Sequence, residues 1–289
     1  MTNTGSYFIP REQVHPFFNP MAMRNQEGLF LAWETDAGVA RNVLPPIFEP
    51  LDPARGLATA YVVNIREPTF APWYMEGGIS LLCRYGDTVG AYFLNLQLSG
   101  PGAQMGLFGG RELGGLPKKL CERIVVERTG DSARAFIEAK GRRIFDAQIE
   151  IGTYNDPEMG QLHPTAKPGG QDRGSALLFA YETSEAPDGR RTFPRMHLIK
   201  WDSVVDYQSW EPARITSIAM EPSLDDPWAE LAVVRPIGAA YSINSDRVAD
   251  ISRIAQLEGD QADALISYLF SGRWDRSTIS ARAQRYGQF

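Results

Sequence analysis

Short strand-like segments separated by turn residues constrain the fold of this chain more than any other feature. Residues 57–67, 77–86 and 89–98 read as strands, and so do 120–128, 133–140 and 142–152. Gly86-Asp87 joins the second and third segments, which predicts a hairpin there. Thr129-Gly130-Asp131 and Gly141 separate the later ones. The pattern is that of an antiparallel β protein.

Helical patterns are fewer. Asp36 is typical of a helix start, and residues 37–44 carry apolar residues at helical spacing before Pro45-Pro46 ends the segment. A short helix is expected over 103–113. We expect residues 1–27 to be irregular, and the polar, Pro- and Gly-rich segment 153–174 to form a long loop over the site.

Strand patterns return over 175–182, 195–207, 210–220 and 228–243, and helical periodicity returns near residue 250. We therefore expect residues 1–289 to form a single α+β domain, mainly antiparallel β, arranged as a curved sheet or barrel with a few flanking helices. Its core would span about 25–250, and 251–289 would form a C-terminal helical extension.

Composition narrows the function. A net charge of −6 and a pI near 5.3 argue against a nucleic-acid surface. The chain has no apolar run approaching ~18 residues and no secretory signal at its start, so we expect neither a membrane partner nor export.

The two cysteines, Cys83 and Cys121, match no zinc or redox spacing. Two buried or half-buried thiols in the cytoplasm are favoured, and a disulfide between them stays open. The three histidines lie far apart, and GxSxG and P-loop motifs are missing, so we expect no metal and no cofactor.

Two adjacent lysines, Lys118 and Lys119, follow a turn-rich Gly-Gly-Leu-Pro. The pair is either a solvated turn or the site of an amine nucleophile. A lysine attacks a carbonyl only when neutral, and its reference pKa of ~10.4 makes that form scarce. A second ammonium ~7 Å away supplies about 2.4 kcal/mol of repulsion, roughly half of what is needed. Burial must supply the rest, and the apolar neighbours expected are Met105, Leu107, Phe108, Leu113 and Leu116.

These residues resemble the signature of the acetoacetate decarboxylase superfamily. The run GRELGGLPKKL at 110–120 is similar to the family's Gly-Arg-Glu followed by Pro-Lys-Lys. Tyr-Met-Glu at 74–76 resembles its Tyr-x-Glu segment, and residues 30–46 resemble its strand-then-helix entry. The likeness extends from about residue 25 to 250 and is most specific at 110–120.

The resemblance implies a role for several residues. Lys118 matches the Schiff-base lysine, and Lys119 matches the cationic neighbour that activates it in acetoacetate decarboxylase. Glu76 matches the active-site glutamate, which would deliver a proton to carbon or manage protons during imine formation.

Three further residues are candidates for substrate binding. Arg111 matches the arginine of the Gly-Arg-Glu run, where a substrate contact and a structural ion pair are equally good interpretations. Gln26 stands where the decarboxylases carry an arginine, and Tyr61 where they carry a second acid. Both are expected to line the pocket, and both departures weigh against acetoacetate itself as substrate.

The implied function is a cofactor-free lyase that acts on a keto acid through a lysine iminium, first of all a decarboxylase of acetoacetate-like β-keto acids. A pyruvate or 2-keto acid aldolase-dehydratase or hydratase using the same lysine stays open, as does a non-catalytic small-molecule binding barrel. The resemblance also implies a homo-oligomer, for which open sheet edges give a physical motive.

Overall fold

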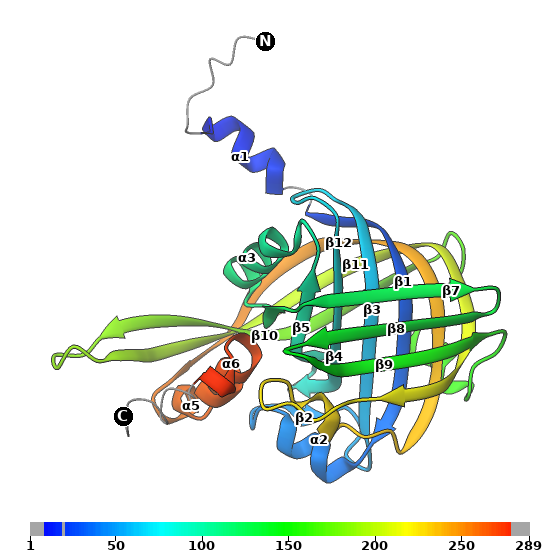
Figure 1. The fold of residues 1–289 in the computed structure, drawn as a ribbon. Coiled ribbons are helices and arrows are strands. Elements are labelled where there is room, and N and C mark those ends of the chain that lie inside the picture. The colour runs from blue at the N-terminus through cyan, green and yellow to red at the C-terminus, as the bar shows by residue number, and fades with distance from the viewer. Residues whose placement is uncertain (1–8, 19–20, 279–289) are drawn as a thin grey trace.

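A computed structural model describes residues 9–18 and 21–278 (Figure 1). The strands form one sheet in the order β10-β5-β4-β3-β1-β12-β11-β9-β8-β7. The elements of the first half are α1 (Arg11–Phe18), β1 (Ala22–Thr35), α2 (Ala37–Val43), β2 (Glu49–Pro50), β3 (Gly56–Pro68), β4 (Tyr74–Tyr85), β5 (Thr88–Ser99), α3 (Ala103–Gly114), β6 (Lys118–Leu120) and β7 (Arg123–Thr129).

The second half holds the longest strands. Its elements are β8 (Ser132–Ala139), β9 (Arg142–Ile151), α4 (Glu158–Leu162), β10 (Gln171–Glu185), β11 (Arg191–Ala219), a 3₁₀ helix (Pro227–Glu230), β12 (Arg235–Glu258), α5 (Asp260–Asp263) and α6 (Ile266–Arg273). The sequence prediction of an antiparallel β fold with a few helices is confirmed.

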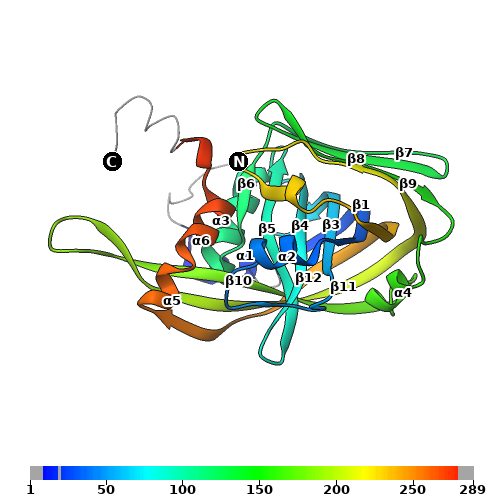
Figure 2. The same ribbon diagram turned by 90° about the horizontal axis from the view of Figure 1, so that it is seen from below.

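The sheet closes on itself. Strand β10 pairs with β11 along most of its length and meets β5 at a single parallel bridge, Ala176 to Ala91. The path from β10 through β5, β4, β3, β1, β12 and β11 therefore returns to β10 and encloses an interior. Strands β9, β8 and β7 continue from β11 and pack across the outside of this wall (Figures 1 and 2).

Alternation along the strands fills both faces of the wall. Leu29 and Leu31 of β1 are buried in the core shared with β7, β8 and β9. Phe30, between them, points the other way and lines the interior cavity. Successive side chains of a strand face opposite sides, so one strand supplies a packed core and a site wall together.

The two helices predicted over 37–44 and 103–113 form as α2 and α3, and the residues at their ends explain where they start and stop. The Asp36 carboxylate caps α2 by accepting a hydrogen bond from the Val39 amide at 2.9 Å, and that helix stops at Leu44 before the prolines. Helix α3 ends at Gly115, whose φ of 71° is left-handed. A Cβ there would lie 2.2 Å from the Phe179 carbonyl oxygen, so only glycine fits.

The predicted helical tail is wrong over residues 251–258, which belong to β12. Ile251 pairs with Trp201 and Leu257 with Met196, so backbone pairing along β11 overrides the helical spacing of the apolar residues. The short helices α5 and α6 follow, residues 276–278 are again helical, and residues 279–289 lie outside the described part. Figure 1 shows β10 and β11 extending from the barrel as a two-stranded arm.

Other boundaries also differ from the sequence prediction. The expected irregular start, 1–27, contains α1, and β1 already begins at Ala22. The expected loop 153–174 contains α4 and the first residues of β10. The segment 228–243 is strand only from Arg235 onward, because Trp228 is buried within a 3₁₀ turn. The hairpin at Gly86-Asp87 forms as predicted, between β4 and β5.

Candidate active site

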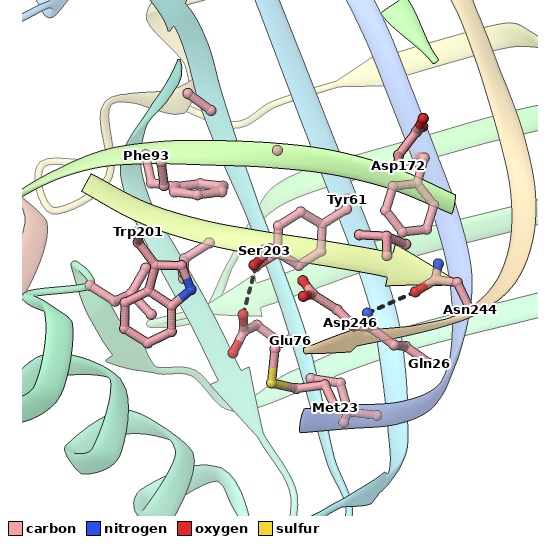
Figure 3. Close-up of a pocket in the computed structure, with 18 of the residues that line it drawn as sticks. Met23, Gln26, Tyr61, Glu76, Phe93, Asp172, Trp201, Ser203, Asn244 and Asp246 are labelled. Carbon is pink, nitrogen blue, oxygen red and sulfur yellow. Dashed lines mark hydrogen bonds between the residues drawn. The ribbon is translucent and has the colours of Figure 1, made fainter. Parts of the chain in front are cut away.

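The barrel interior holds a cavity of about 420 Å³. Its wall is mostly apolar and aromatic, with a few polar side chains that point inward (Figure 3). The residues that matter below come from β1, β3, β4, β6, β11 and β12, and they include Gln26, Tyr61, Glu76, Lys118, Ser203, Asn244 and Asp246. A largely apolar cavity with a small convergent polar group is the usual form of a small-molecule site.

Lys118 and Glu76 form a buried ion pair on this wall. The lysine Nζ donates to Glu76 Oε2 at 2.7 Å, and the two residues are only 5% and 6% exposed. Tyr61 donates its hydroxyl to the other oxygen, Oε1, at 2.6 Å (Figure 3). Burial and the Glu76 charge raise the pKa of Tyr61 well above its usual range, so the phenol stays a donor.

The sheet brings these residues together across 42 positions of sequence. Strand β5 lies between β4 and β6, with Glu76 opposite Leu98 and Lys118 opposite Leu96. The three residues of β6 pair in parallel with β5 directly after the α3 turn. The sequence prediction that Lys118, Glu76 and Tyr61 share one pocket is met by this geometry.

The Gly-rich stretch before the lysines makes room for the site. A Cβ at Gly110 would come within 2.8 Å of Lys118 Cε, and one at Gly114 within 2.0 Å of the Trp201 ring. Glycine at these positions lets α3 lie directly on the lysine stem and the indole. The glycines of this stretch therefore allow close packing of α3 on Lys118 and Trp201.

Lys119 points away from the cavity. Its Nζ donates to the Asp225 carbonyl at 2.6 Å and lies 3.6 Å from carboxylate oxygens of Asp226 and Asp275. Asp226 also accepts hydrogen bonds from Asn95 at 2.6 Å and Gln97 at 2.8 Å. The carboxylates of Asp226 and Asp275 offset the charge of Lys119. The repulsion between the Lys119 and Lys118 ammonium groups, which the sequence argument relied on, is therefore weaker than expected.

The expected apolar surroundings are only half correct. Leu107 and Leu116 are buried, and Leu116 lines the cavity. The prediction is wrong for the other three. Each of them is exposed on the outer face of α3: Met105, Phe108 and Leu113. The apolar contacts come instead from residues far apart in sequence, among them Tyr74, whose ring centroid lies 6.0 Å from Lys118 Nζ.

Gln26 lines the cavity as predicted. Its Nε2 donates to Asn244 Oδ1 at 2.8 Å, and both residues are buried (Figure 3). Asn25, just before it, has a φ of 51° at a register shift between β1 and β12. This bulge turns the Gln26 side chain toward the interior.

Arg111 lies elsewhere. It is half-buried on α3 with its guanidinium 5.2 Å from the centre of the Trp274 ring, and burial lowers its pKa. It is not part of the cavity wall that the described residues form. The contact seen for Arg111 is thus with an aromatic ring, and among the described residues neither the expected ion pair nor a place on the cavity wall is found for it.

Sequence reasoning missed Asp246. Its Oδ1 is shielded from water without a hydrogen-bond partner, although the residue as a whole is half-buried at the cavity wall. Burial raises its pKa to about 7, an effect that the Ser203 hydroxyl partly offsets. The signal was present: Ser242, Asn244 and Asp246 alternate along β12, which predicts a polar row on one face.

A second polar group lies at the cavity wall near α4. Asp172 accepts a hydrogen bond from the Tyr207 hydroxyl at 2.9 Å and faces His163, whose Nδ1 is 3.6 Å away. Arg173 is exposed beside them and also lines the cavity. Within the segment 153–174, Leu162, His163 and Pro164 reach the cavity wall, whereas Asp172, Arg173 and Gly174 line it as part of strand β10.

The remaining sequence expectations concern thiols, metals and membranes. Cys83 and Cys121 are free, buried and half-buried respectively, and burial raises the pKa of both thiols to about 12. Among the described residues, no cluster of His, Cys, Asp and Glu is arranged to hold a metal ion. None of the helices described is long and apolar enough to cross a bilayer.

Comparison with known proteins places this geometry in context. Residues 7–256 match the family model of acetoacetate decarboxylase. A curated relative, the "CLA biosynthesis isomerase" of Lactiplantibacillus plantarum, is 32% identical over 285 residues, which cover 97% of this chain and 99% of the relative.

Solved structures show the same fold. An acetoacetate decarboxylase from Legionella pneumophila superposes with a TM-score of 0.66 at 19% identity, covering 82% of this chain and 88% of its own. The enduracididine biosynthesis enzyme MppR, complexed with the condensation product of pyruvate and imidazole 4-carboxaldehyde, gives a TM-score of 0.60 at 16% identity, covering 88% and 93%. At these identities the likeness extends to the fold alone.

Proposed function

Because the chain belongs to the acetoacetate decarboxylase family, we propose that it is an enzyme that binds a carbonyl compound as an iminium on Lys118 and isomerises it by proton transfer at the neighbouring carbons. The observation that carries the proposal is the Lys118–Glu76 pair, 2.7 Å apart, on the wall of an apolar cavity. The relative that is 32% identical is named an isomerase, which supports isomerisation as the reaction.

The first step concerns nitrogen. Lys118 Nζ passes a proton to Glu76 across their 2.7 Å contact, which leaves a neutral amine in place. The amine adds to the carbonyl carbon, and Glu76 returns its proton to the oxygen. Glu76 then carries a second proton from the nitrogen to the same oxygen, which leaves as water while the nitrogen lone pair forms the C=N bond. Tyr61 holds Glu76 in position through Oε1. The product is an iminium and one water molecule.

The second step concerns carbon. The iminium withdraws electrons from the adjacent carbon, whose proton becomes acidic. In a β,γ-unsaturated ketone, loss of this proton gives a dienamine, and return of a proton to the γ carbon moves the double bond into conjugation. Hydrolysis then consumes one water molecule and releases the amine, so the overall reaction is a pure isomerisation.

The charge of the cavity favours a ketone over a 2-keto acid. Among the described residues that line it, the fixed cations are Lys118, which the iminium uses, and Arg173 near α4. A carboxylate next to the reacting carbonyl would thus lack a partner, which is costly in apolar surroundings. This argues against pyruvate and leaves the aldolase-dehydratase interpretation without a supporting contact.

Decarboxylation of a β-keto acid is the second candidate. It uses the same iminium, and the apolar wall favours loss of a charged carboxylate as neutral CO2. The family match supports it. Isomerisation removes a proton from the carbon beside the iminium and returns one to the γ carbon, whereas decarboxylation removes CO2 from that carbon and returns a proton to it.

Borohydride trapping separates these outcomes. The protein is incubated with oct-4-en-2-one, acetoacetate or pyruvate, then reduced, and the modified peptide is located by mass spectrometry. Conversion of the octenone is followed by the absorbance of the conjugated enone, and CO2 is measured with acetoacetate. Lys118→Ala should lose every adduct, whereas Lys200→Ala, a lysine paired with Asp202 outside the cavity, should keep them.

The expected result is an adduct on Lys118 with the octenone together with enone formation. CO2 release without isomerisation would make decarboxylation the function. A pyruvate adduct alone would favour the aldolase-dehydratase. A folded protein that forms no adduct with any of the three would leave a binding barrel as the best description.

A further inference from the structure

The two oxygens of Glu76 are both occupied. Oε2 accepts from Lys118 and Oε1 accepts from Tyr61, each at hydrogen-bond distance. A carboxylate held in this way is well placed to exchange a proton with the nitrogen beside it. It has no free oxygen to direct at a carbon atom of the substrate, so a second group must do that work.

Asp246 is the carboxyl group that remains available. It comes from β12, where it lies opposite Met23 of β1 and Val205 of β11. Its Oδ1 has no hydrogen-bond partner, and the Asp246 side chain lies at the cavity wall near Glu76 (Figure 3). Buried carboxylate oxygens are nearly always hydrogen-bonded, so an unpaired one beside a reactive lysine indicates a functional position.

We propose that Asp246 is the acid–base group that moves the carbon-bound proton, while Glu76 serves the formation and hydrolysis of the iminium on Lys118. This inference rests on the proposed iminium function. In the forward direction the Asp246 carboxylate takes the α proton, and the C–H electron pair forms the enamine. The protonated Asp246 then returns a proton to carbon, and the iminium is restored.

The surroundings of Asp246 suit this cycle. The charged and titratable groups that act on it are Glu76 and Lys118 across the cavity, with Tyr61, Tyr74 and Tyr207 around it, and the Ser203 hydroxyl supports its charged form. Burial and the nearby Glu76 charge bring its pKa to about 7. A group that is half-protonated near neutral pH both accepts and donates protons efficiently.

Deuterium exchange tests whether Asp246 and Glu76 have these separate roles. The intact protein is incubated with 2-octanone in D2O, and exchange of the hydrogens next to the carbonyl is followed by NMR, because exchange there requires the enamine. The same samples are trapped with borohydride to measure iminium formation on Lys118. The variants are Asp246→Asn, Asp246→Glu and Asp250→Asn, the last changing the same charge at an exposed position of β12.

Asp246→Asn should retain trapping within about 2-fold but lose at least ~100-fold in exchange rate, the usual contribution of a general base. Asp246→Glu should recover part of the rate, and Asp250→Asn should match the wild type. Retained trapping also shows that the variant site is folded. Wild-type exchange in Asp246→Asn would overturn the role of Asp246 alone. Absence of both trapping and exchange in the wild type would overturn the iminium function itself, and this inference with it.

Discussion

Gly110 and Lys118 are in direct contact: a Cβ at position 110 would lie 2.8 Å from the lysine Cε and 2.9 Å from its Cδ. The glycine belongs to α3 and the lysine to β6, and the turn at Gly115 folds one onto the other. The first residue of the Gly-Arg-Glu run thus packs directly against the stem of the Lys118 side chain.

Gly110→Ala should therefore displace the lysine. We expect the rate of borohydride trapping to fall at least ~10-fold, because small misplacements of a reacting group are costly. The matched control is Gly109→Ala, where nothing lies within 4 Å of the added methyl group. That variant should keep the trapping rate and gain up to ~1 kcal/mol of helix stability. Equal trapping by both variants would contradict the packing argument.

Lys119 should matter for stability. Lys119→Met leaves Asp226 buried at 3% exposure without its cation, and we expect the free energy of unfolding in urea to drop by about 3–5 kcal/mol. Adding Asp226→Asn should recover part of the loss. Lys200→Met, which breaks a half-exposed pair with Asp202, should cost under ~1 kcal/mol. A Lys119→Met protein with full stability and no trapping would restore the activating role inferred from the sequence.

The hydroxyls of Tyr61 and Tyr74 should behave oppositely. Tyr61→Phe removes the donor to Glu76 Oε1 and should lower the free energy of unfolding by about 1.5–3 kcal/mol, as expected for a bond to a charged group. The Tyr74 hydroxyl is buried with no hydrogen-bond partner, so Tyr74→Phe should be neutral or stabilising by about 1 kcal/mol. Both are measured by thermal and urea unfolding, and a destabilised Tyr74→Phe with an unaffected Tyr61→Phe would reverse these assignments.

The titration of Asp246 predicts a dependence of stability on pH. Its pKa is about 7 in the folded protein and near 3.8 in the unfolded chain, so the folded state binds more protons between these values. Its contribution to stability is thus present in full below about pH 4 and is lost as the pH rises through about 7.

Comparison with Asp246→Asn isolates this effect. The free energy of unfolding of the wild type, relative to the variant, should fall by roughly 2–4 kcal/mol between pH 4 and pH 8. The measurement is a set of urea titrations at fixed ionic strength. A difference that stays constant across this range would show that the carboxyl group titrates as an ordinary exposed aspartate.

Local patterns were sufficient for part of this molecule. The alternation of apolar residues marked most strands, the turn at Gly86-Asp87 marked a hairpin, and Asp36 marked a helix start, because each depends on contacts between residues close in sequence. The Gly-Arg-Glu and Pro-Lys-Lys run, with Glu76 upstream, identified the family and its candidate lysine through resemblance.

Only the tertiary structure decided which distant side chains meet. Closure of the barrel placed Asp246 of β12 beside Glu76 of β4, and it turned Lys119 toward Asp226 instead of Lys118's cavity. Pairing with β11 converted residues 251–258 from an expected helix to strand. Sheet register and closure depend on hydrogen bonds between segments far apart in the chain, which local spacing does not specify.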